Sequence, residues 1–336
     1  MLENPTVIFK KPLDVVLENT SMPSIGYGEV LIQTSRTLIS TGTELTILSG
    51  EFPKESAWAE YGKYPFLAGY SNIGVVVEIG EGVDASWKNQ RVASFSGHSK
   101  YVKSPVESAK KVSDGISDEQ AAFFTIAEVV MNGVRRGQIQ FGESVVIYGL
   151  GLLGQLTAQF SGICGAKPVI GIDVAQTRLD LLPKKPSIIG VNSQNCDIIE
   201  KVKELTKGRM ADVIFELTGN QNLIPKEFAL LKKKLGRFIV LSSPRGAVLF
   251  DFHDLCNRPS FTIIGIHHNS HPEYETSGNP WTQSRHTELF FDYVKDGEIK
   301  LDNLISHRAK FSQAPELYKM LLKDRAQAMG VILEWE

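Results

Sequence analysis

The stretch that decides the fold is Ser144-Val145-Val146-Ile147-Tyr148-Gly149-Leu150-Gly151-Leu152-Leu153-Gly154. It begins with a short apolar run rich in β-branched residues, as in a strand that is buried on both faces. A turn with three glycines follows at once, and the apolar residues after it recur at helical spacing. The sequence therefore predicts a strand, a tight turn and a helix, which is the beginning of a parallel βαβ unit.

Each glycine of this turn has a separate task in a dinucleotide-binding site. Gly149 permits the tight turn, Gly151 leaves room for a pyrophosphate, and Gly154 lets the helix pack closely on the strand. The helix that begins with Leu152 and Leu153 offers free N–H groups and a partial positive charge to the phosphates. The alternative is that the glycines are only turn residues, but the elements that follow favour a dinucleotide.

The next predicted strand ends at Asp173, about 20 residues beyond the turn. A carboxylate at this place can accept hydrogen bonds from both hydroxyls of an adenosine ribose, and it would repel a 2′-phosphate. The sequence therefore favours NAD over NADP. Arg178 is near enough to keep NADP as an alternative, and Asp173 as a simple helix cap is another.

Around this unit the character of the chain changes twice. About 110 residues of short β-branched runs, broken by Gly and Pro, come first and predict an all-β lobe. From Ser117, a candidate N-cap with Gln120 three residues on, strands and helices alternate as in a doubly wound parallel sheet. A polar loop and a helix follow, and we expect the last strand, GVILEW, to rejoin the first lobe. The fold class is thus α/β, with predicted domains 1–120, 121–268 and 269–336.

Composition limits the possible partners. The chain has 336 residues, 22% of them charged, and a formal net charge of -2, which is typical of a globular protein and does not favour nucleic acid or an anionic membrane. No apolar stretch approaches the roughly 20 residues needed to span a bilayer, and the first residues lack the apolar core of a signal peptide. We therefore expect a cytoplasmic protein with a small-molecule substrate. The three scattered cysteines, Cys164, Cys196 and Cys256, are interpreted as small buried apolar residues.

Several stretches resemble the medium-chain dehydrogenase/reductase family over most of the chain. They are residues 73–83, 89–95, 121–155 and 213–220, and the last of them includes Thr218 and Gly219, which resemble the loop beneath the cofactor. The resemblance implies a GroES-like β lobe, a Rossmann domain and NAD(H)-dependent redox chemistry. Residues 38–44, 98–102 and 305–308 resemble the branch of polyol, cyclitol and bacteriochlorophyllide dehydrogenases.

The sequence departs from this family at the catalytic zinc. The positions that hold zinc ligands in relatives correspond to Thr41, to Tyr70 and Ser71, and to Thr125. Zinc prefers thiolate, imidazole and carboxylate, so we expect no metal at this place. Hydroxyl groups would then have to stabilise the substrate oxygen.

The resemblance and the residue types together give the catalytic candidates. Thr43 matches the residue that passes the alcohol proton in zinc-dependent relatives, and Tyr70 and Thr41 are further donors. Glu44 matches an acid that steadies a ligand histidine; here it either accepts a hydrogen bond from Tyr70 or caps a turn. His98 borders the active site in relatives and titrates near neutral pH, although a packing role is an open alternative.

Other polar residues have weaker interpretations. His267, His268 and His271 suggest a metal site, but neighbouring residues of an extended segment point to opposite faces, so we favour a merely polar loop. Trp281 and Tyr274 either stack on a ring-shaped substrate or anchor the loop. Glu128 is expected to face solvent. His307 and Arg308 are interpreted as structural or rim residues.

The sequence therefore predicts a zinc-independent, NAD(H)-dependent oxidoreductase that acts on a secondary alcohol or ketone of a sugar- or cyclitol-like substrate. The alternatives are a zinc-free enone or quinone reductase, a nucleotide-binding lyase or decarboxylase, and a non-catalytic protein. The apolar run 261–266 resembles the edge strand through which relatives pair, which predicts a homodimer.

Overall fold

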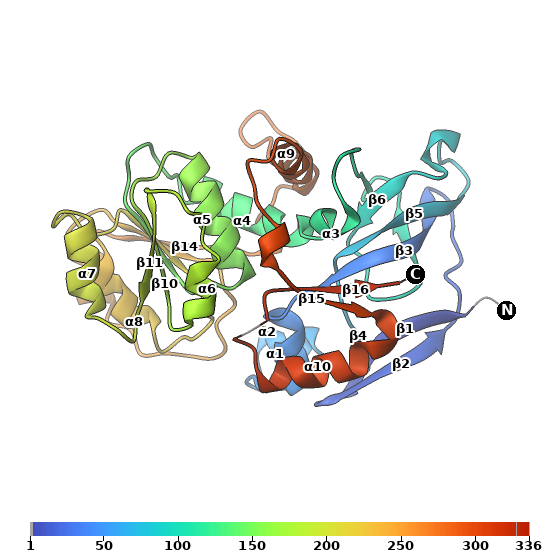
Figure 1. Cartoon of the computed structure of the whole chain (residues 1–336), viewed down its shortest axis with the longest axis horizontal. Helices are drawn as coiled ribbons and strands as arrows, with labels where there is room; N and C mark the ends of the chain where they lie inside the picture. The colour runs from blue at the N-terminus through green and yellow to red at the C-terminus, as the bar shows by residue number, and fades with distance from the viewer. Residues whose placement is uncertain (1–2, 327, 336) are drawn as a thin grey trace. The chain divides into compact units, whose positions relative to one another are not determined.

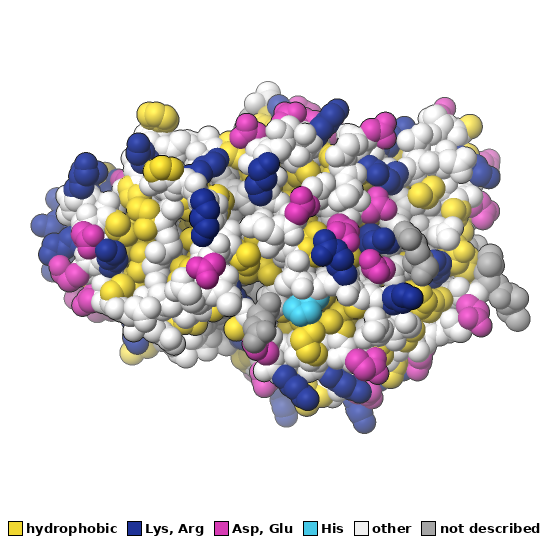
Figure 2. Space-filling view, in the orientation of Figure 1, with side chains coloured by type: hydrophobic (Ala, Val, Ile, Leu, Met, Phe, Trp, Pro, Cys, Tyr) yellow, Lys and Arg dark blue, Asp and Glu magenta, His cyan; other side chains and the backbone are white. Residues whose placement is uncertain are grey.

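The computed structural model describes residues 3–326 and 328–335. It divides the chain into two compact units, one made of residues 1–125 and 287–336 and the other of residues 126–286. No described helix has the length and apolar character that a bilayer span requires. On the face drawn in Figure 2, the dark blue Lys and Arg side chains are mixed with magenta Asp and Glu side chains.

The second unit is built on a six-stranded sheet in the order β11-β10-β9-β12-β13-β14, and every neighbouring pair is parallel. The chain starts in the middle at β9, moves outward to β11, and returns to β12 on the other side of β9. This is the doubly wound topology that the alternating pattern predicts. The strands are β9 (Val145–Tyr148), β10 (Val169–Asp173), β11 (Ile188–Asn192), β12 (Val213–Glu216), β13 (Arg237–Val240) and β14 (Thr262–Gly265).

Helices cover both faces of this sheet. Figure 1 shows α5 (Leu152–Ile163) and α6 (Gln176–Asp180) on one side, and α7 (Ile198–Leu205) and α8 (Ile224–Glu227) on the other. The inward side chains form an apolar cluster, which explains why the strands are almost uninterrupted β-branched runs. Its fully buried members include Val146, Ile170, Ile172, Ile214 and Phe238.

Helix α8 has only 4 residues. After α8 the chain continues only as a 3₁₀ turn, Phe228–Leu230. Phe228 stacks on Phe238 with ring centroids 4.2 Å apart, so packing of this side chain takes precedence over continuing the helix.

The first unit contains a seven-stranded sheet, with the path β15-β16-β3-β5-β6-β8 and with β7 paired to β3, and a smaller sheet in the order β2-β1-β4. The larger sheet consists of β3 (Glu29–Ile39), β5 (Asn72–Ile79), β6 (Arg91–Ser94), β7 (Tyr101–Pro105), β8 (Lys110–Lys111), β15 (Ile305–Lys310) and β16 (Gly330–Glu334). The smaller one consists of β1 (Asn4–Lys11), β2 (Asp14–Thr20) and β4 (Phe66–Leu67). The predicted β lobe is therefore confirmed.

The C-terminal segment completes this unit, as predicted. β16 pairs antiparallel with β3, and the buried Trp335 donates its indole N–H to Thr37 at 2.9 Å. Before it, α10 (Ala314–Lys323) packs beside α1 (Thr43–Ser49) and β2. A short helix, α2 (Ala57–Tyr61), follows α1.

The segment after Ser117 confirms one prediction and corrects another. Ser117 and Gln120 form a complete capping box, but the helical stretch splits into α3 (Asp118–Ala121) and α4 (Phe124–Arg136). Glu128 on α4 was expected in solvent and is fully buried, because almost every face of this helix is covered. A further helix, α9 (Gln283–Lys295), follows the polar loop.

The cysteine prediction is also wrong. Cys164 and Cys196 are exposed, and Cys256 is half-buried. Cys164 is the C-cap of α5 and Cys196 directly precedes the N-cap of α7. These places at helix ends lie outside the core, and apolar character alone did not reveal that.

Candidate functional site

The glycine turn between β9 and α5 has the geometry that a phosphate-binding turn needs. Gly149 has a φ of +97°, where a side chain is strained. A Cβ there would also lie 2.8 Å from the backbone of Leu217. The turn is therefore pressed against the loop that follows β12, and only glycine fits.

The other two glycines differ in what surrounds them. A Cβ on Gly154 would lie 2.1 Å from the carbonyl oxygen of Gly149, whereas a Cβ on Gly151 would meet nothing within 4 Å. Gly154 thus serves close packing, and Gly151 borders open space. Gly151 is also the N-cap of α5 and has no side chain to cap it, so the first N–H groups of the helix, at Leu152 and Leu153, have no partner within it.

Asp173 ends β10 and lies against this turn. One of its carboxylate oxygens accepts the N–H of Leu150 at 2.8 Å, and the other accepts that of Ala175 at 2.9 Å. Arg178 is 3.5 Å away. Each oxygen has two lone pairs. The oxygen bonded to Leu150 also faces Arg178, whereas the oxygen bonded to Ala175 can still accept a further hydrogen bond. These features fit the adenosine ribose of a dinucleotide.

The sequence did not reveal Glu216, which organises the Thr218–Gly219 loop. This fully buried carboxylate at the end of β12 accepts the N–H and hydroxyl of Thr218 at 2.7 and 2.5 Å, and the N–H of Gly219 at 3.0 Å. Its other oxygen accepts a hydrogen bond from Ser242. The sequence did carry a signal for this residue, since Glu216 is an acid at the end of an otherwise apolar strand.

A second buried carboxyl lies close to the first. Glu227, at the end of α8, is 1% exposed, and neither of its oxygens has a hydrogen-bond partner among the described residues. Burial, and secondarily the charge of Glu216, raise the pKa of Glu227 to about 9. Glu227 is therefore protonated at neutral pH.

A small hollow of about 290 Å³ lies beside the glycine turn. It is lined by Tyr148, which directly precedes Gly149, and by Asp197, Ile198, Ile199, Lys226 and Leu230. Apolar walls with a few polar groups suit a flat aromatic base. None of these residues was singled out from the sequence, because they come from four different elements.

In the other unit, the hydroxyl groups predicted to replace zinc form a cluster around Tyr70. Its hydroxyl donates to Ser40 at 2.5 Å and lies 3.5 Å from the hydroxyl of Thr43. Burial raises the pKa of Tyr70 to about 12, so the phenol keeps its proton at neutral pH. Ser40 was not among the predicted residues, although it precedes Thr41 and lies at the end of β3.

Glu44 has different partners from those expected. It does not accept from Tyr70: one oxygen accepts the N–H of Ser40 at 2.7 Å, and the other lies 3.1 Å from Nε2 of His98. The hydroxyl of Tyr318, on α10, donates to the same oxygen as His98. Of the two alternatives from the sequence, the turn cap holds, because Glu44 reaches back to Ser40.

His98 is fully buried and is therefore not a surface residue. With Nε2 directed at Glu44, its Nδ1 has no partner among the described residues. The ring also lies against the backbone next to Tyr70, because a Cβ on Gly69 would be 2.7 Å from it.

The remaining residues at the zinc positions are engaged elsewhere or are unsuitable ligands. Ser71 donates to the carbonyl of Ala122 at 2.5 Å; Thr125 is buried and Thr41 is half-buried. Asn72, next to Ser71, donates to Thr34 and to Gly97. This set of donors does not fit zinc, and within the described ranges no group of three His, Cys, Asp or Glu residues is arranged to hold a metal.

The histidine loop is folded rather than extended, contrary to our argument. Residues 268–270 form a 3₁₀ turn, and the rings of His267 and His268 lie 4.8 Å apart instead of on opposite faces. Trp281 is held between Arg135 and Arg285, whose guanidinium carbons lie 3.2 and 4.3 Å from its ring centroid. This tryptophan therefore anchors the loop.

The predicted structural roles of His307 and Arg308 agree with their contacts. Arg308 makes two hydrogen bonds to Glu119, each 2.8 Å long. His307 contacts Ser306 at 2.8 Å. Tyr274 is exposed.

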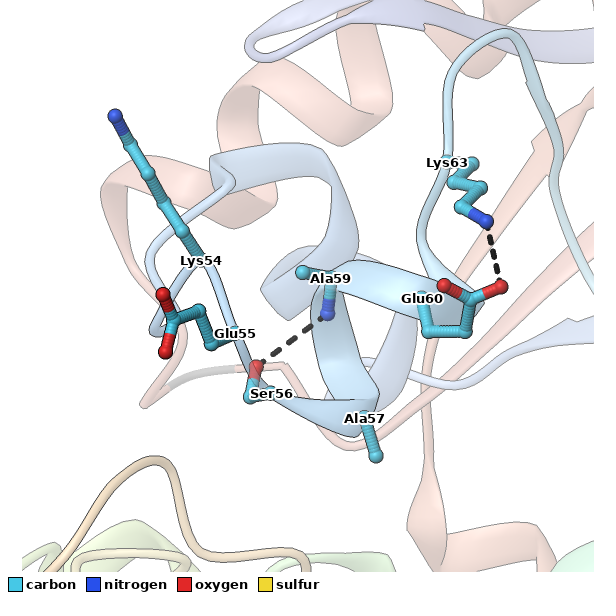
Figure 3. Close-up of a pocket in the computed structure, with 7 residues that line it drawn as sticks. All are labelled: Lys54, Glu55, Ser56, Ala57, Ala59, Glu60 and Lys63. Atoms are coloured by element: carbon cyan, nitrogen blue, oxygen red, sulfur yellow. Dashed lines mark hydrogen bonds and ion pairs between the residues drawn. The ribbon is translucent and has the colours of Figure 1, made fainter.

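A hollow of the first unit lies elsewhere. It has a volume of about 460 Å³ around the start of α2 and is drawn in Figure 3. Its polar groups bond to neighbours in the sequence: the hydroxyl of Ser56 accepts the N–H of Ala59 and caps α2, and Lys63 pairs with Glu60 at 2.5 Å. Lys54 points away from the other labelled residues (Figure 3).

Comparisons with known proteins agree with this geometry. The family model described as zinc-binding dehydrogenase matches residues 153–282. An alcohol dehydrogenase of Cupriavidus necator is 24% identical over 97% of both chains. A D-guloside 3-dehydrogenase of Escherichia coli is 26% identical over 77% of this chain and 74% of its own.

Solved structures of similar fold cover the whole chain. A dehydrogenase of Escherichia coli, solved with NADH, has a TM-score of 0.80 at 19% identity and covers 99% of both chains. A zinc-binding dehydrogenase of Sinorhizobium meliloti, solved with NADP, has a TM-score of 0.80 at 20% identity, over 99% of this chain and 100% of its own. With its β lobe, its doubly wound sheet and these relatives, the chain is similar to zinc-type alcohol dehydrogenase-like oxidoreductases of the medium-chain dehydrogenase/reductase family.

Proposed function

We propose that the chain is an NAD-dependent dehydrogenase that interconverts a secondary alcohol and a ketone without zinc. The observation that carries this proposal is the Tyr70 cluster. The hydroxyl of Tyr70, which keeps its proton, lies beside those of Ser40 and Thr43 at a position that resembles a zinc-ligand position of relatives.

Asp173 supports NAD over NADP. Its carboxylate keeps a lone pair for a ribose hydroxyl, whereas a 2′-phosphate would bring negative charge against a buried carboxylate. Arg178, 3.5 Å from Asp173, partly offsets that charge, and a relative of the same fold was solved with NADP. The ratio of kcat/KM for the two cofactors tests the preference directly.

The chemistry that NAD(H) supplies when bound is hydride transfer. The residues of the chain then have to stabilise the oxygen of the substrate. In the reductive direction, the Tyr70 hydroxyl turns its single proton from Ser40 toward the carbonyl oxygen as negative charge develops there. In the oxidative direction, the neutral hydroxyls of Tyr70 and Thr43 cannot hold an extra proton, so they relay the proton of the alcohol to a base. We assign His98 to proton exchange, because its Nδ1 is unoccupied within the described structure and its Nε2 is held by Glu44.

A polyhydroxylated substrate is the class that we propose. Segments 38–44, 98–102 and 305–308 resemble the polyol and cyclitol branch, and a D-guloside 3-dehydrogenase is among the relatives. A cluster of neutral hydroxyls suits such a substrate, because it can exchange hydrogen bonds with sugar hydroxyls without a charge.

The test is turnover followed by the absorbance of reduced nicotinamide, with a panel of sugars, cyclitols and ketoses. We expect activity with NAD that is unaffected by a strong zinc chelator. Tyr70→Phe should lower kcat about a hundredfold, while Tyr27→Phe, an exposed tyrosine, should leave it unchanged. Full activity of Tyr70→Phe, loss of activity on chelation, or reduction of enones alone would each contradict the proposal.

A further inference from the structure

We infer that Tyr318 is a positioning residue for the hydroxyl of Tyr70 and acts through Glu44 and Ser40. The inference rests on the proposed function, in which Tyr70 hydrogen-bonds to the substrate oxygen. Tyr318 belongs to α10, far from the other members in sequence, and no motif marks it.

The centre of the arrangement is the buried carboxylate of Glu44. It is 1% exposed, and within the described ranges it has no Lys or Arg partner. Its donors are the N–H of Ser40, Nε2 of His98 and the hydroxyl of Tyr318. A buried carboxylate is tolerated only when such donors replace its lost water, so each of them helps to fix its position.

Tyr318 is suited to remain a donor. It is fully buried, and burial together with the neighbouring charge of Glu44 raises its pKa well above the usual value. The phenol therefore stays protonated, and its O–H stays directed at Glu44. Its ring is held separately by an edge-on contact with Phe9, at 5.1 Å between centroids.

Two connections lead from Glu44 to Tyr70. In the first, the carboxylate holds the N–H of Ser40 at 2.7 Å, and the hydroxyl of Ser40 holds that of Tyr70 at 2.5 Å. In the second, His98 is held at 3.1 Å, and its ring packs on Gly69, the residue before Tyr70. Gly69 has a φ of +90°, so the backbone there takes a conformation that few other residues allow. A shift of the carboxylate would therefore move Tyr70 from both sides.

A variant of Tyr318 can distinguish a positioning role of its hydroxyl from a role in packing alone. Tyr318→Phe keeps the ring and its contact with Phe9 but removes the donor. If the hydroxyl only supported the fold, the variant would be less stable yet would retain its kcat. If it positions Tyr70, kcat should fall while substrate binding through other contacts persists.

The experiment compares Tyr318→Phe with Tyr64→Phe in the full chain. Tyr64 is a partly buried tyrosine of the same unit whose hydroxyl donates to the carbonyl of Ile47, away from Glu44. We expect Tyr318→Phe to lower kcat about tenfold, to change KM less than twofold, and to displace the pH profile of kcat. Tyr64→Phe should retain the kcat and the pH profile of the wild type.

A second variant tests the path itself. Glu44→Gln should lower kcat with KM unchanged. In the double variant with Tyr318→Phe, the loss of kcat should be no greater than that of the worse single variant, because both substitutions act through the carboxylate of Glu44. Multiplied losses of kcat in the double variant would overturn the inference. Full kcat in Glu44→Gln would also overturn it, even if Tyr318→Phe failed to fold. If Tyr318→Phe keeps kcat and pH profile while Tyr70→Phe is inactive, only the positioning role is wrong. If Tyr70→Phe is also fully active, the proposed function itself is wrong.

Discussion

Replacing Glu227 with glutamine should stabilise the protein at neutral pH, and the gain should grow as the pH rises. The side chain is buried without a partner among the described residues, and its pKa is raised from 4.5 to about 9. Between these two values the unfolded chain is ionised at this residue while the folded chain keeps the proton. The unfolded state then binds fewer protons, so the free energy of unfolding falls as the pH rises.

The size of the effect follows from this linkage. Each pH unit in the window changes the free energy of unfolding by at most about 1.4 kcal/mol, which gives roughly 3 kcal/mol between pH 5 and pH 7. Glutamine has nearly the same shape as the protonated acid and does not titrate. Glu227→Gln should therefore match the wild type near pH 5 and exceed it by several degrees in Tm at pH 7.

Thermal unfolding from pH 5 to pH 9 measures this difference. Glu200→Gln, an exposed position on α7 that pairs with Lys203, is the matched control and should give a difference that does not grow with pH. A Tm difference for Glu227→Gln that is independent of pH would mean that Glu227 is ionised in the folded protein, and our account of its environment would be refuted.

Two further predictions concern the second unit. Gly151→Ala should weaken NAD binding at least tenfold in calorimetry without lowering Tm, because a Cβ there meets open space. Gly154→Ala should instead lower Tm, because its Cβ would collide with Gly149. A lower Tm for Gly151→Ala together with unchanged NAD binding would contradict the assignment of the pyrophosphate to Gly151. Ile263→Lys should convert the proposed homodimer into a monomer in light scattering, since Ile263 is exposed on β14 at the edge of the sheet; a wild-type protein that is already monomeric would remove the dimer.

Local patterns allowed much of the fold to be predicted. The order of strand, glycine turn and helix around Gly149 depends only on residues within one βαβ unit, and the capping box at Ser117 depends on four successive residues. The return of the last strand also followed, because an isolated apolar strand has to pair somewhere. Such features are decided by short-range sterics and periodicity.

The candidate site was less predictable, because its contacts join distant parts of the chain. Glu44 was predicted either to accept from Tyr70 or to cap a turn. Neither alternative included its partners His98 and Tyr318, which lie on a loop after β6 and on α10. Spacing alone gives no measure of such distances. Glu128 was misplaced for the same reason: its burial depends on what packs over α4, and its own charge suggested the opposite.

The C-terminal return has a consequence for how the protein is made. Glu44 is synthesised long before Tyr318, and β3 long before β16. During translation the second unit can fold as soon as it has emerged. The first unit must wait, with an exposed edge on β3 and with Glu44 still lacking the hydrogen bond from Tyr318. The step that finishes assembly of this unit is therefore also the one that completes the set of donors around Glu44. Under the proposed mechanism, a chain released early would be inactive as well as prone to aggregate.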